Sequence, residues 1–546
     1  MRKLISALAG IFALFCAGQA YAGATIIAPQ LPRVIDIRTF GAKCDGVTND
    51  VGAINAASVY LRGSGGGIVY LPPTGRLCAA TGFSLPSGVS LEGMLGSSFP
   101  GPTATPAQYA AAGGSWLLPL DPTNPAITMG NHGNDVSQIG IAYPQNIPTT
   151  SFTPIFYPYA VKMACDTCTL SDVTIVGASH GIQLVYPQAS GGGTNVNIRN
   201  VLDEALVTCF SENYVNDVVH IDNLHCRNLY YASNAAMQAW LLANLVGMDD
   251  HYFDNPTITN YDCLYCAVGM RFTDDTVMGN THSLYNGQLA NIQCDLVVEC
   301  MASAASTTTV TGAIAGLQMQ SAGGATATLL NLPSDNVRLT ISNLAVPFGG
   351  STLANVGGGH SGSLGITGAN IAGYSQTARG QTGFVVNKGA VVSMSGAQTF
   401  GKPSGAGIRF AGAGAANGVW TDRFRAISVF TVPGQLTGAT NGSNQTLTVP
   451  YLQRPGQEGV FQMRITGSFT ITTPVANSTL GLSLALLPEI AATGISGATS
   501  GSVSFDSGWI DVTPAHLTAL TNLGAVIING SPGIRWSSNA LQIMTR

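Results

Sequence analysis

Hydrophobic and polar residues alternate in short stretches that recur along the middle of the chain. One stretch runs from Val196 to Asp203, and a similar one runs from Val219 to Cys226, an offset of 226 − 203 = 23 residues. Val173 to His180 precedes them at the same offset, 203 − 180 = 23. A period of two predicts β-strands, and equal repeats of strand, turn, strand and turn are typical of a stacked solenoid.

Further copies of the pattern follow at longer offsets. Thr257 to Cys263 and Leu289 to Cys294 continue the series at 263 − 226 = 37 and 294 − 263 = 31 residues, and weaker copies run from Leu339 to Asn343 and from Gly365 to Asn370. The segments between copies vary in length. Because insertions at one repeat position map to one face of a solenoid, we expect a binding surface there.

Two columns of equivalent positions run through these copies. Asn tolerates the left-handed backbone and bonds to neighbouring amides, which predicts turn residues for the first column: Asn200, Asn223, Asn260, Asn291, Asn343 and Asn370. The second column lies three residues further on and consists of His180, Asp203, Cys226, Cys263 and Cys294. We expect its cysteines to be packed or paired inside the coil.

A helical pattern precedes the repeats. Val51, Ile54, Ala57 and Leu61 form one apolar face of a predicted helix, with Thr48 or Asn49 as its N-cap. Short strands at 68–71 and 89–91 follow, bounded by Gly and Pro. The apolar face of this helix must therefore pack against another part of the fold.

The motifs of this segment resemble the N-terminal part of the pectate-lyase-like family that includes polygalacturonase-like hydrolases and phage tailspikes. The matching elements are Asp36…Phe40-Gly41-Ala42, Asp45-Gly46-Val47-Thr48-Asn49-Asp50, Gly65-Gly66-Gly67…Tyr70-Leu71-Pro72-Pro73 and Leu85-Pro86-Ser87-Gly88-Val89. The resemblance implies an all-β fold, a right-handed parallel β-helix with an N-terminal capping helix. It identifies a fold and leaves the reaction open.

Composition divides the 546 residues into four parts. With 9% charged residues and 67 Gly, strands and tight turns are favoured over charged helices. We expect a signal peptide (1–22), a strand and capping-helix segment (23–95) and the β-helix (96–425). Alternating strands after a composition shift predict a C-terminal β-sandwich (430–546).

The first 22 residues have the pattern of a targeting segment, with Arg2-Lys3, an apolar run and the small-x-small site Ala20-Tyr21-Ala22. We expect a secreted or periplasmic protein. Without Arg2 and Lys3 the charge is 20 − 27 = −7, which argues against a nucleic-acid partner. No other apolar run approaches the roughly 20 residues of a membrane span.

Ten of the 11 cysteines remain after the signal segment, an even number that favours disulfides in an exported protein. Cys44 and Cys78 flank the predicted helix and are the first expected pair. The Cys-x-x-Cys pairs at 165/168 and 263/266 also suit a zinc site, but export favours structural sulfur. We expect no metal and no cofactor.

Acidic residues gather in the variable segments. Asp249 and Asp250 precede Pro256, Asp274 and Asp275 follow Phe272, and 274 − 249 = 25 is close to one coil. Glycoside hydrolysis needs one protonated carboxyl for the leaving oxygen and one carboxylate to attack or to activate water. These four acids are therefore the predicted catalytic residues.

Neighbouring residues are predicted to bind the substrate. Glu212 adds a carboxylate, Tyr252 and Trp240 could stack on sugar faces, His251 could carry a proton and Arg271 could hold an anionic group. Structural alternatives stay open. An Asp-Asp pair after a strand is also typical of a solvated turn, and 230–245 of an amphipathic helical insert.

The resemblance does not supply the catalytic set. Polygalacturonase-like hydrolases carry Asn-Thr-Asp, Asp-Asp, Gly-His-Gly and Arg-Ile-Lys elements in that order. Asp249-Asp250 or Asp274-Asp275 resembles the second, and Gly359-His360-Ser361-Gly362 comes nearest to the third. The first and last have no good equivalent, and His360 is more typical of a loop.

These features together predict a polysaccharide-degrading enzyme, with a glycoside hydrolase as the leading hypothesis. The alternative is a polysaccharide lyase, in which Arg271 lies beside carboxylates that could bind Ca²⁺, although Lys and Arg are scarce. A third hypothesis is a noncatalytic glycan-binding surface protein. Tailspike relatives are commonly trimers, but a signal peptide is unusual for a phage fibre, so a homotrimer stays open.

Overall fold

The computed structural model describes residues 33–75, 77–95, 113–130, 132–146, 150–185, 195–213, 215, 218–228, 234–273, 284–303, 308–322, 328–348, 352–357, 361–371 and 382–395, and from residue 409 onward the backbone of strands. The predicted signal peptide, Asp274, Asp275 and His360 lie outside these residues.

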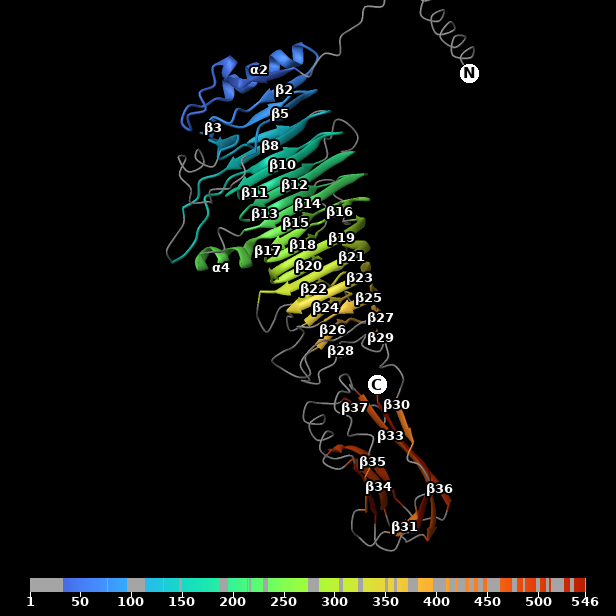
Figure 1. Cartoon of the computed structure of the whole chain (residues 1–546). Coiled ribbons are helices and arrows are strands. Elements are labelled where there is room, and N and C mark those ends of the chain that lie inside the picture. Colours follow the sequence, from blue (N-terminus) through green and yellow to red (C-terminus); the bar gives the residue numbers. More distant parts are fainter. Residues whose placement is uncertain are drawn as a thin grey trace, which may run out of the picture.

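Two long parallel sheets dominate the fold (Figure 1). Sheet A has 17 strands: β1 (Val34–Asp36), β2 (Gly67–Tyr70), β3 (Leu77–Ala80), β5 (Val89–Glu92), β6 (Trp116–Pro119), β8 (Asp135–Ala142), β10 (Thr169–Val176), β12 (Val196–Glu204), β14 (Val219–Arg227), β16 (Thr257–Thr259), β17 (Asp262–Leu264), β19 (Leu284–Val297), β21 (Thr309–Ser321), β23 (Asn336–Phe348), β25 (Ser363–Asn370), β27 (Val391–Ser395) and β29 (Gly418–Trp420). Sheet B has 12 strands: β4 (Phe83–Leu85), β7 (Ile127–Met129), β9 (Tyr159–Met163), β11 (His180–Val185), β13 (Thr208–Asn213), β15 (Val246–Asp250), β18 (Val268–Phe272), β20 (Glu299–Ser303), β22 (Thr328–Leu332), β24 (Thr352–Val356), β26 (Thr382–Val386) and β28 (Arg409–Ala411).

The chain alternates between the two sheets as it advances. β10 is followed by β11 and β12 by β13, while β10 pairs with β12 and β11 with β13, always in parallel. Each coil therefore stacks on the one before it. The fold is a right-handed parallel β-helix, as the N-terminal motifs predict.

Most of the predicted register is confirmed. Val196 pairs with Val219, Cys226 with Cys263 and Cys263 with Cys294, the offsets of 23, 37 and 31 expected from the repeats. The first offset is wrong, because Val173 pairs with Val201, 28 residues on. His180 consequently does not precede Asp203 in the second column but begins a strand of sheet B.

The asparagine column is confirmed at five of its six positions. Asn200, Asn223, Asn260, Asn291 and Asn343 all have positive φ, between 53° and 60°. Side-chain amides join two pairs of them: Asn223 Nδ2 donates to Asn200 Oδ1 at 3.0 Å, and Asn291 Nδ2 donates to Asn260 Oδ1 at 3.1 Å. Asn370 is not part of it, since Gly368 (φ 65°) occupies the position opposite Asn343.

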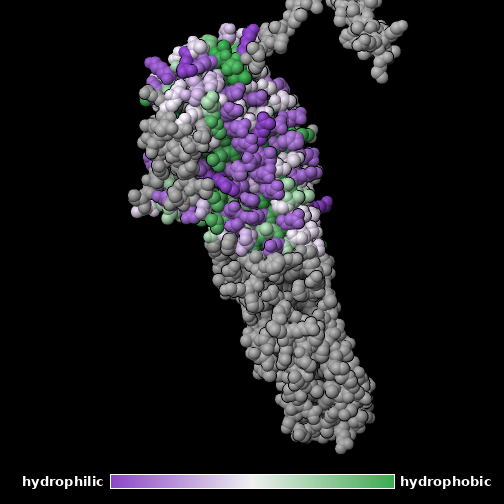
Figure 2. Space-filling view, in the orientation of Figure 1, coloured by the Kyte–Doolittle hydropathy of each residue, from purple (hydrophilic) through white to green (hydrophobic). Residues whose placement is uncertain are grey.

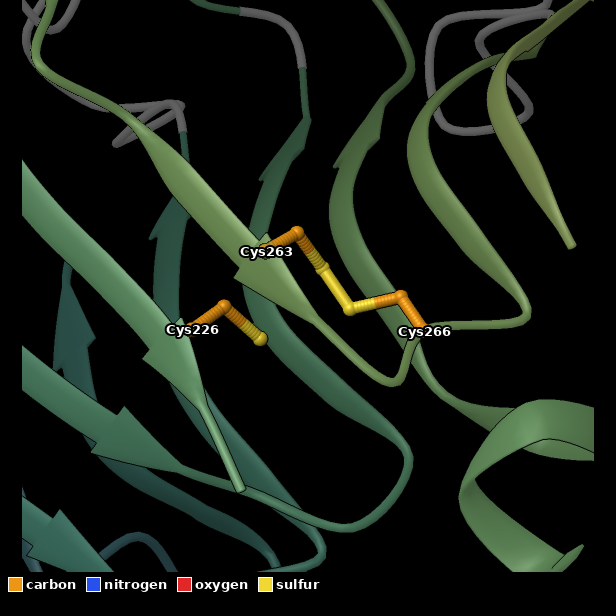
Figure 3. A group of neighbouring side chains, drawn as sticks. All are labelled: Cys226, Cys263 and Cys266. Carbon is orange, nitrogen blue, oxygen red and sulfur yellow. A yellow bond between two sulfur atoms is a disulfide. The ribbon is translucent and has the colours of Figure 1, made fainter. Parts of the chain in front are cut away.

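The interior of the coil is mainly apolar and contains buried disulfides. All ten cysteines of the described residues pair: Cys44–Cys78, as predicted, Cys165–Cys168, Cys209–Cys226, Cys263–Cys266 and Cys294–Cys300. Figure 3 shows Cys226 beside the Cys263–Cys266 disulfide. Although the sulfurs of these three residues lie within 4.8 Å of one another, each belongs to a disulfide and none offers a thiolate to a metal.

Helix α2 (Val51–Gly63) covers the N-terminal end of the coil and buries Ile54, Ala57 and Leu61, as expected. Its N-cap is Asp50, one residue later than predicted. The Asp50 carboxylate accepts from the backbone of Lys43 and Cys44 at 2.7 and 2.9 Å and so secures the preceding loop. The short 3₁₀ helix η1 (Ile37–Phe40) precedes it.

A second helix, α4 (Ala235–Asn244), lies at the side of the coil between β14 and β15 (Figure 1). The Asn234 side chain accepts from the amides of Ala236 and Met237 and caps it. Within the described residues, no helix is long and apolar enough to cross a membrane.

Two antiparallel sheets form the C-terminal part, as predicted for a β-sandwich. One contains β30 (Ser428–Thr431), β31 (Thr437–Ala439), β33 (Gln462–Thr473), β36 (Gly501–Asp506), β37 (Ile510–Asp511) and β39 (Arg535–Thr545). The other contains β32 (Gln445–Thr448), β34 (Thr479–Leu484), β35 (Leu487–Ser496) and β38 (Ala525–Gly530). Contacts of β35 with β33 and β36 join the two sheets.

Candidate active site

A row of polar side chains crosses five successive strands of sheet B. Parallel register aligns Lys162 on β9 with Gln183, Ser211, Asp249 and Arg271 on the strands that follow. Neighbouring positions in such a row are about 4.8 Å apart. In β9, β11 and β18 the residues on both sides of the row are buried hydrophobic residues, so the row lies on the outer face.

Asp249 is the centre of a charged triad in this row. Arg271 donates to it twice, from Nε to Oδ1 at 2.8 Å and from Nη2 to Oδ2 at 2.6 Å. His251 Nε2 lies 3.3 Å from Asp249 Oδ2, and Thr273 Oγ1 lies 3.0 Å from His251 Nδ1. Asp249, His251 and Arg271, which the sequence analysis assigned to one site, therefore lie together.

These contacts determine the charge of Asp249. Burial opposes its ionisation, but the hydrogen bonds and charges of Arg271 and His251 outweigh burial and lower its pKa to about 2. The pKa of Arg271 is raised, mainly by its hydrogen bond to Asp249. Asp249 is thus held as a carboxylate and is unsuited to donating a proton near neutral pH.

Tyr159 and His180 form a second group on the same face. Their ring centroids are 4.9 Å apart, at the first residues of the adjacent strands β9 and β11. Burial lowers the pKa of His180, and the charge of Asp249 opposes this shift. Burial raises the pKa of Tyr159, opposed by a hydrogen bond with Ser211. A neutral imidazole and a neutral phenol therefore lie within electrostatic range of Asp249.

Glu212 and Asp250 form a buried pair inside the coil. They occupy matching positions on β13 and β15, and both side chains are inaccessible to solvent. Glu212 accepts from the backbone amides of Val215 at 2.6 Å and Tyr252 at 3.0 Å. Burial raises the pKa of both carboxyls, and the charge of Asp250 raises that of Glu212 further.

This geometry corrects one expectation from the sequence. Asp250 and Glu212 do not share the outer face with Asp249, because successive residues of a strand point to opposite sides of the sheet. The pair holds the loop that follows β15 instead, since Glu212 binds the amide of Tyr252. The Tyr252 ring itself is only partly buried.

Trp240 belongs to an aromatic cluster beside sheet B. Its ring makes edge contacts with Phe152 and Phe156 at centroid distances of 6.0 and 6.5 Å. Its indole Nε1 donates to the Leu206 carbonyl at 3.3 Å, which anchors α4 against the turn between β12 and β13. The exposed ring of this cluster is Phe156, with 56% of its surface accessible.

The sequence argument missed Tyr159, His180, Lys162 and Ser211. The misplaced first repeat put His180 in sheet A, so its proximity to Asp249 could not be recognised. With the correct register, the alternation would have identified Lys162 and Ser211 as outward positions. Tyr159 and His180 lie three residues before Lys162 and Gln183, so alternation alone would have assigned them to the inner face. Asp274 and Asp275 lie just beyond the last described residue of this region, Thr273.

Comparisons with known proteins identify similar folds. No protein-family model matches the chain, and no curated protein sequence matches it. Similar solved structures include the tailspike protein of E. coli bacteriophage HK620 in complex with pentasaccharide, with 11% identity over 94% of this chain and 93% of that one, TM-score 0.47. The Dettilon tailspike protein shows 13% identity over 93% and 94% of the two chains, TM-score 0.44. The A-module of Azotobacter vinelandii mannuronan C-5 epimerase AlgE4 shows 11% identity over 70% of this chain and 100% of that module, TM-score 0.36. At these identities the likeness is one of fold.

Proposed function

We propose that the protein cleaves an acidic polysaccharide on the outer face of sheet B by β-elimination. The observation that carries this proposal is the Tyr159–His180 ring pair at 4.9 Å, next to the Asp249–Arg271 ion pair. Elimination needs a base, a proton donor and a group that stabilises the uronate carboxylate. The face carries one of each kind.

The residues suit separate steps. The neutral His180 imidazole takes the proton from the carbon next to the uronate carboxylate, and the bond from the neighbouring carbon to the glycosidic oxygen breaks. A carbon–carbon double bond forms, and the leaving oxygen takes a proton from the Tyr159 phenol. The uronate carboxylate is bound by Lys162 or by the guanidinium group of Arg271. The triad with Asp249 and His251 fixes the position of Arg271.

Glycoside hydrolysis is the second candidate. The permanently ionised Asp249 suits a base that activates water, but hydrolysis also needs a protonated carboxyl on the same face. Glu212 and Asp250, the carboxyls of raised pKa nearby, point inward. Hydrolysis would therefore depend on Asp274 or Asp275, two of the four catalytic residues predicted from the sequence, as the acid.

The two reactions give different products. We would incubate the purified protein with polygalacturonate, alginate, xylan and dextran and follow ultraviolet absorbance and reducing ends together. Elimination gives both signals from a uronate polymer, whereas hydrolysis gives reducing ends alone. Reducing ends without absorbance, abolished by Asp274→Asn or Asp275→Asn, would favour the second candidate. Binding without turnover of any polymer would favour a noncatalytic glycan-binding protein.

Substitutions locate the site. His180→Ala and Tyr159→Phe should each lower turnover about 100-fold, the typical contribution of a general acid or base. His220→Ala is the matched control, because His220 is exposed on sheet A. Full activity in the His180 variant would exclude this imidazole as the base.

The protein is further proposed to act outside the cytoplasm. Five disulfides in one chain are typical of proteins that fold in an oxidising compartment. Expression of the full chain and N-terminal sequencing of the exported product would test the predicted cleavage after Ala22. Retention of uncleaved protein in the cytoplasm would contradict it.

A further inference from the structure

A second group of charged residues lies on the other sheet, at the ends of β14, β17 and β19. Asp262 is its centre: Arg227 forms an ion pair with it through Nε, and His225 Nδ1 lies 3.0 Å from Asp262 Oδ2. His225 Nε2 lies 2.7 Å from Asn223 Oδ1. A protonated imidazole can donate to both oxygens. The group has the same Arg–Asp–His composition as the Asp249 triad.

The second triad presents Arg227 at the surface. The Asp262 side chain is only 3% exposed, whereas that of Arg227 is 37% exposed. Asp262 Oδ1 is buried and accepts no hydrogen bond from any described residue. Because the Asp262 carboxylate is almost entirely buried and paired with Arg227, it holds the Arg227 guanidinium in place at the surface.

The strand register places a hydrogen-bond acceptor, Asp295, two strands away from the donor Arg227. Arg227 aligns with Leu264, and Leu264 aligns with Asp295 on the next strand. Gln318 Nε2 donates to Asp295 Oδ1 at 3.1 Å and orients the carboxyl. The two charged residues therefore flank a partly exposed leucine, with backbones roughly 10 Å apart, two strand spacings of a parallel sheet.

We propose that Arg227, Leu264 and Asp295 form a second saccharide-binding site, which holds one sugar ring of the polymer. The apolar face of the ring would rest on Leu264, and hydroxyl groups on its two sides would accept from Arg227 and donate to Asp295. Hydroxyls can do both, which matches a donor and an acceptor on opposite sides of an apolar floor. A divalent cation fits poorly, because Arg227 and His225 already surround the buried carboxylate.

Figure 2 shows that the described part of the coil presents a broad hydrophilic area, with hydrophobic side chains in smaller areas. The site lies on sheet A and the proposed reaction on sheet B, so the two can act independently. Only the choice of ligand class rests on the proposed function.

Binding measurements can separate the two sites. In affinity electrophoresis through gels containing polygalacturonate, alginate, xylan or dextran, the His180→Ala protein should be retarded by at least one polymer. Adding Arg227→Gln or Asp295→Ala should weaken that binding about tenfold, the effect of losing one hydrogen bond to a charged group. Arg199→Gln is the control, since Arg199 is exposed on the same sheet at β12.

The outcomes are distinct. Unchanged retardation in both Arg227→Gln and Asp295→Ala would overturn the inference, as would no retardation of the parent by any of the four polymers. Asp295→Ala leaves the Asp262 triad intact, and circular dichroism melting confirms that each variant folds. If no polymer is cleaved but retardation persists and depends on Arg227, the proposed reaction fails and the second site stands.

Discussion

Asp249 and Asp250 are consecutive residues whose carboxyl groups lie on opposite sides of sheet B. The first forms an ion pair with Arg271 on the outer face, and the second faces Glu212 inside the coil. Their acidities move apart for this reason: the pKa of Asp249 is lowered to about 2, whereas burial raises that of Asp250. One Asp-Asp motif therefore supplies a carboxylate on the outer face of the sheet and, inside the coil, an acid whose pKa burial raises.

The buried pair should make stability depend on pH. An acid whose pKa is raised by folding keeps its proton while the unfolded chain releases it, so stability is fully present below the unfolded pKa, near 4, and is lost as pH rises towards the folded pKa. Each such proton contributes a slope of about 1.4 kcal/mol per pH unit. Asp250→Asn should flatten the slope and raise the unfolding midpoint at pH 7. Urea melts at several pH values measure both.

A structural role of the pair can be separated from a catalytic one. If Asp250→Asn abolishes turnover while the protein is more stable, the buried carboxyl takes part in the reaction after all. Asp135→Asn on the exposed start of β8 is a suitable control and should leave the slope unchanged. An unchanged slope in the Asp250 variant would show that this carboxyl does not cause the pH dependence of stability.

The Asp249–Arg271 pair should matter for stability as well as for the site. Arg271→Gln leaves a mostly buried carboxylate without its bidentate partner, and we expect a loss of about 2 kcal/mol, between the values for exposed and buried pairs. Guanidinium unfolding measures it. Arg38→Gln removes a more exposed ion pair, that with Asp36, and should change the midpoint little. Equal effects of the two variants would contradict the burial argument.

The disulfides should differ in their contribution. Cys209–Cys226 closes 17 residues and Cys165–Cys168 only three. A disulfide that closes about 15 residues contributes roughly 3 kcal/mol in the chain-entropy model, and shorter loops contribute less. Replacing both members of the first pair by Ala should therefore lower the melting temperature more than replacing the second pair. The reverse order in calorimetry would show that native packing, and not loop length, decides.

The sequence predicts the coil well because its constraints are local and repeated. Asn223 and Asn260 reveal the turn column since a left-handed residue with an amide side chain is needed at each coil. The capping helix and the Cys44–Cys78 disulfide follow from apolar spacing and flanking positions. The register failed at the first repeat, because Asp172 has the positive φ, 54°, that Asn has in later coils, so the column could not be traced to it.

The site was predicted only in part for a related reason. Asp249 and His251 are close in sequence, and Arg271 lies one coil of 271 − 249 = 22 residues after Asp249, so these residues meet. Residues on earlier coils, such as Tyr159, need the full register before their position is known. Whether a carboxyl faces solvent or the interior depends on strand phase, and a shift of one residue exchanges the two faces.

The last prediction concerns the pH dependence of catalysis. If His180 is the base, kcat/KM should fall as pH decreases through the pKa of this imidazole, and burial places that pKa below the ordinary value of 6.5. The charge of Asp249 opposes this lowering of the His180 pKa. Asp249→Asn should therefore move the acidic limb of the kcat/KM profile to still lower pH, in addition to any loss of rate. His180→Gln should abolish the limb in the residual activity. A limb near pH 4 that persists in the His180 variant would indicate a catalytic carboxylate and would move the reaction towards hydrolysis.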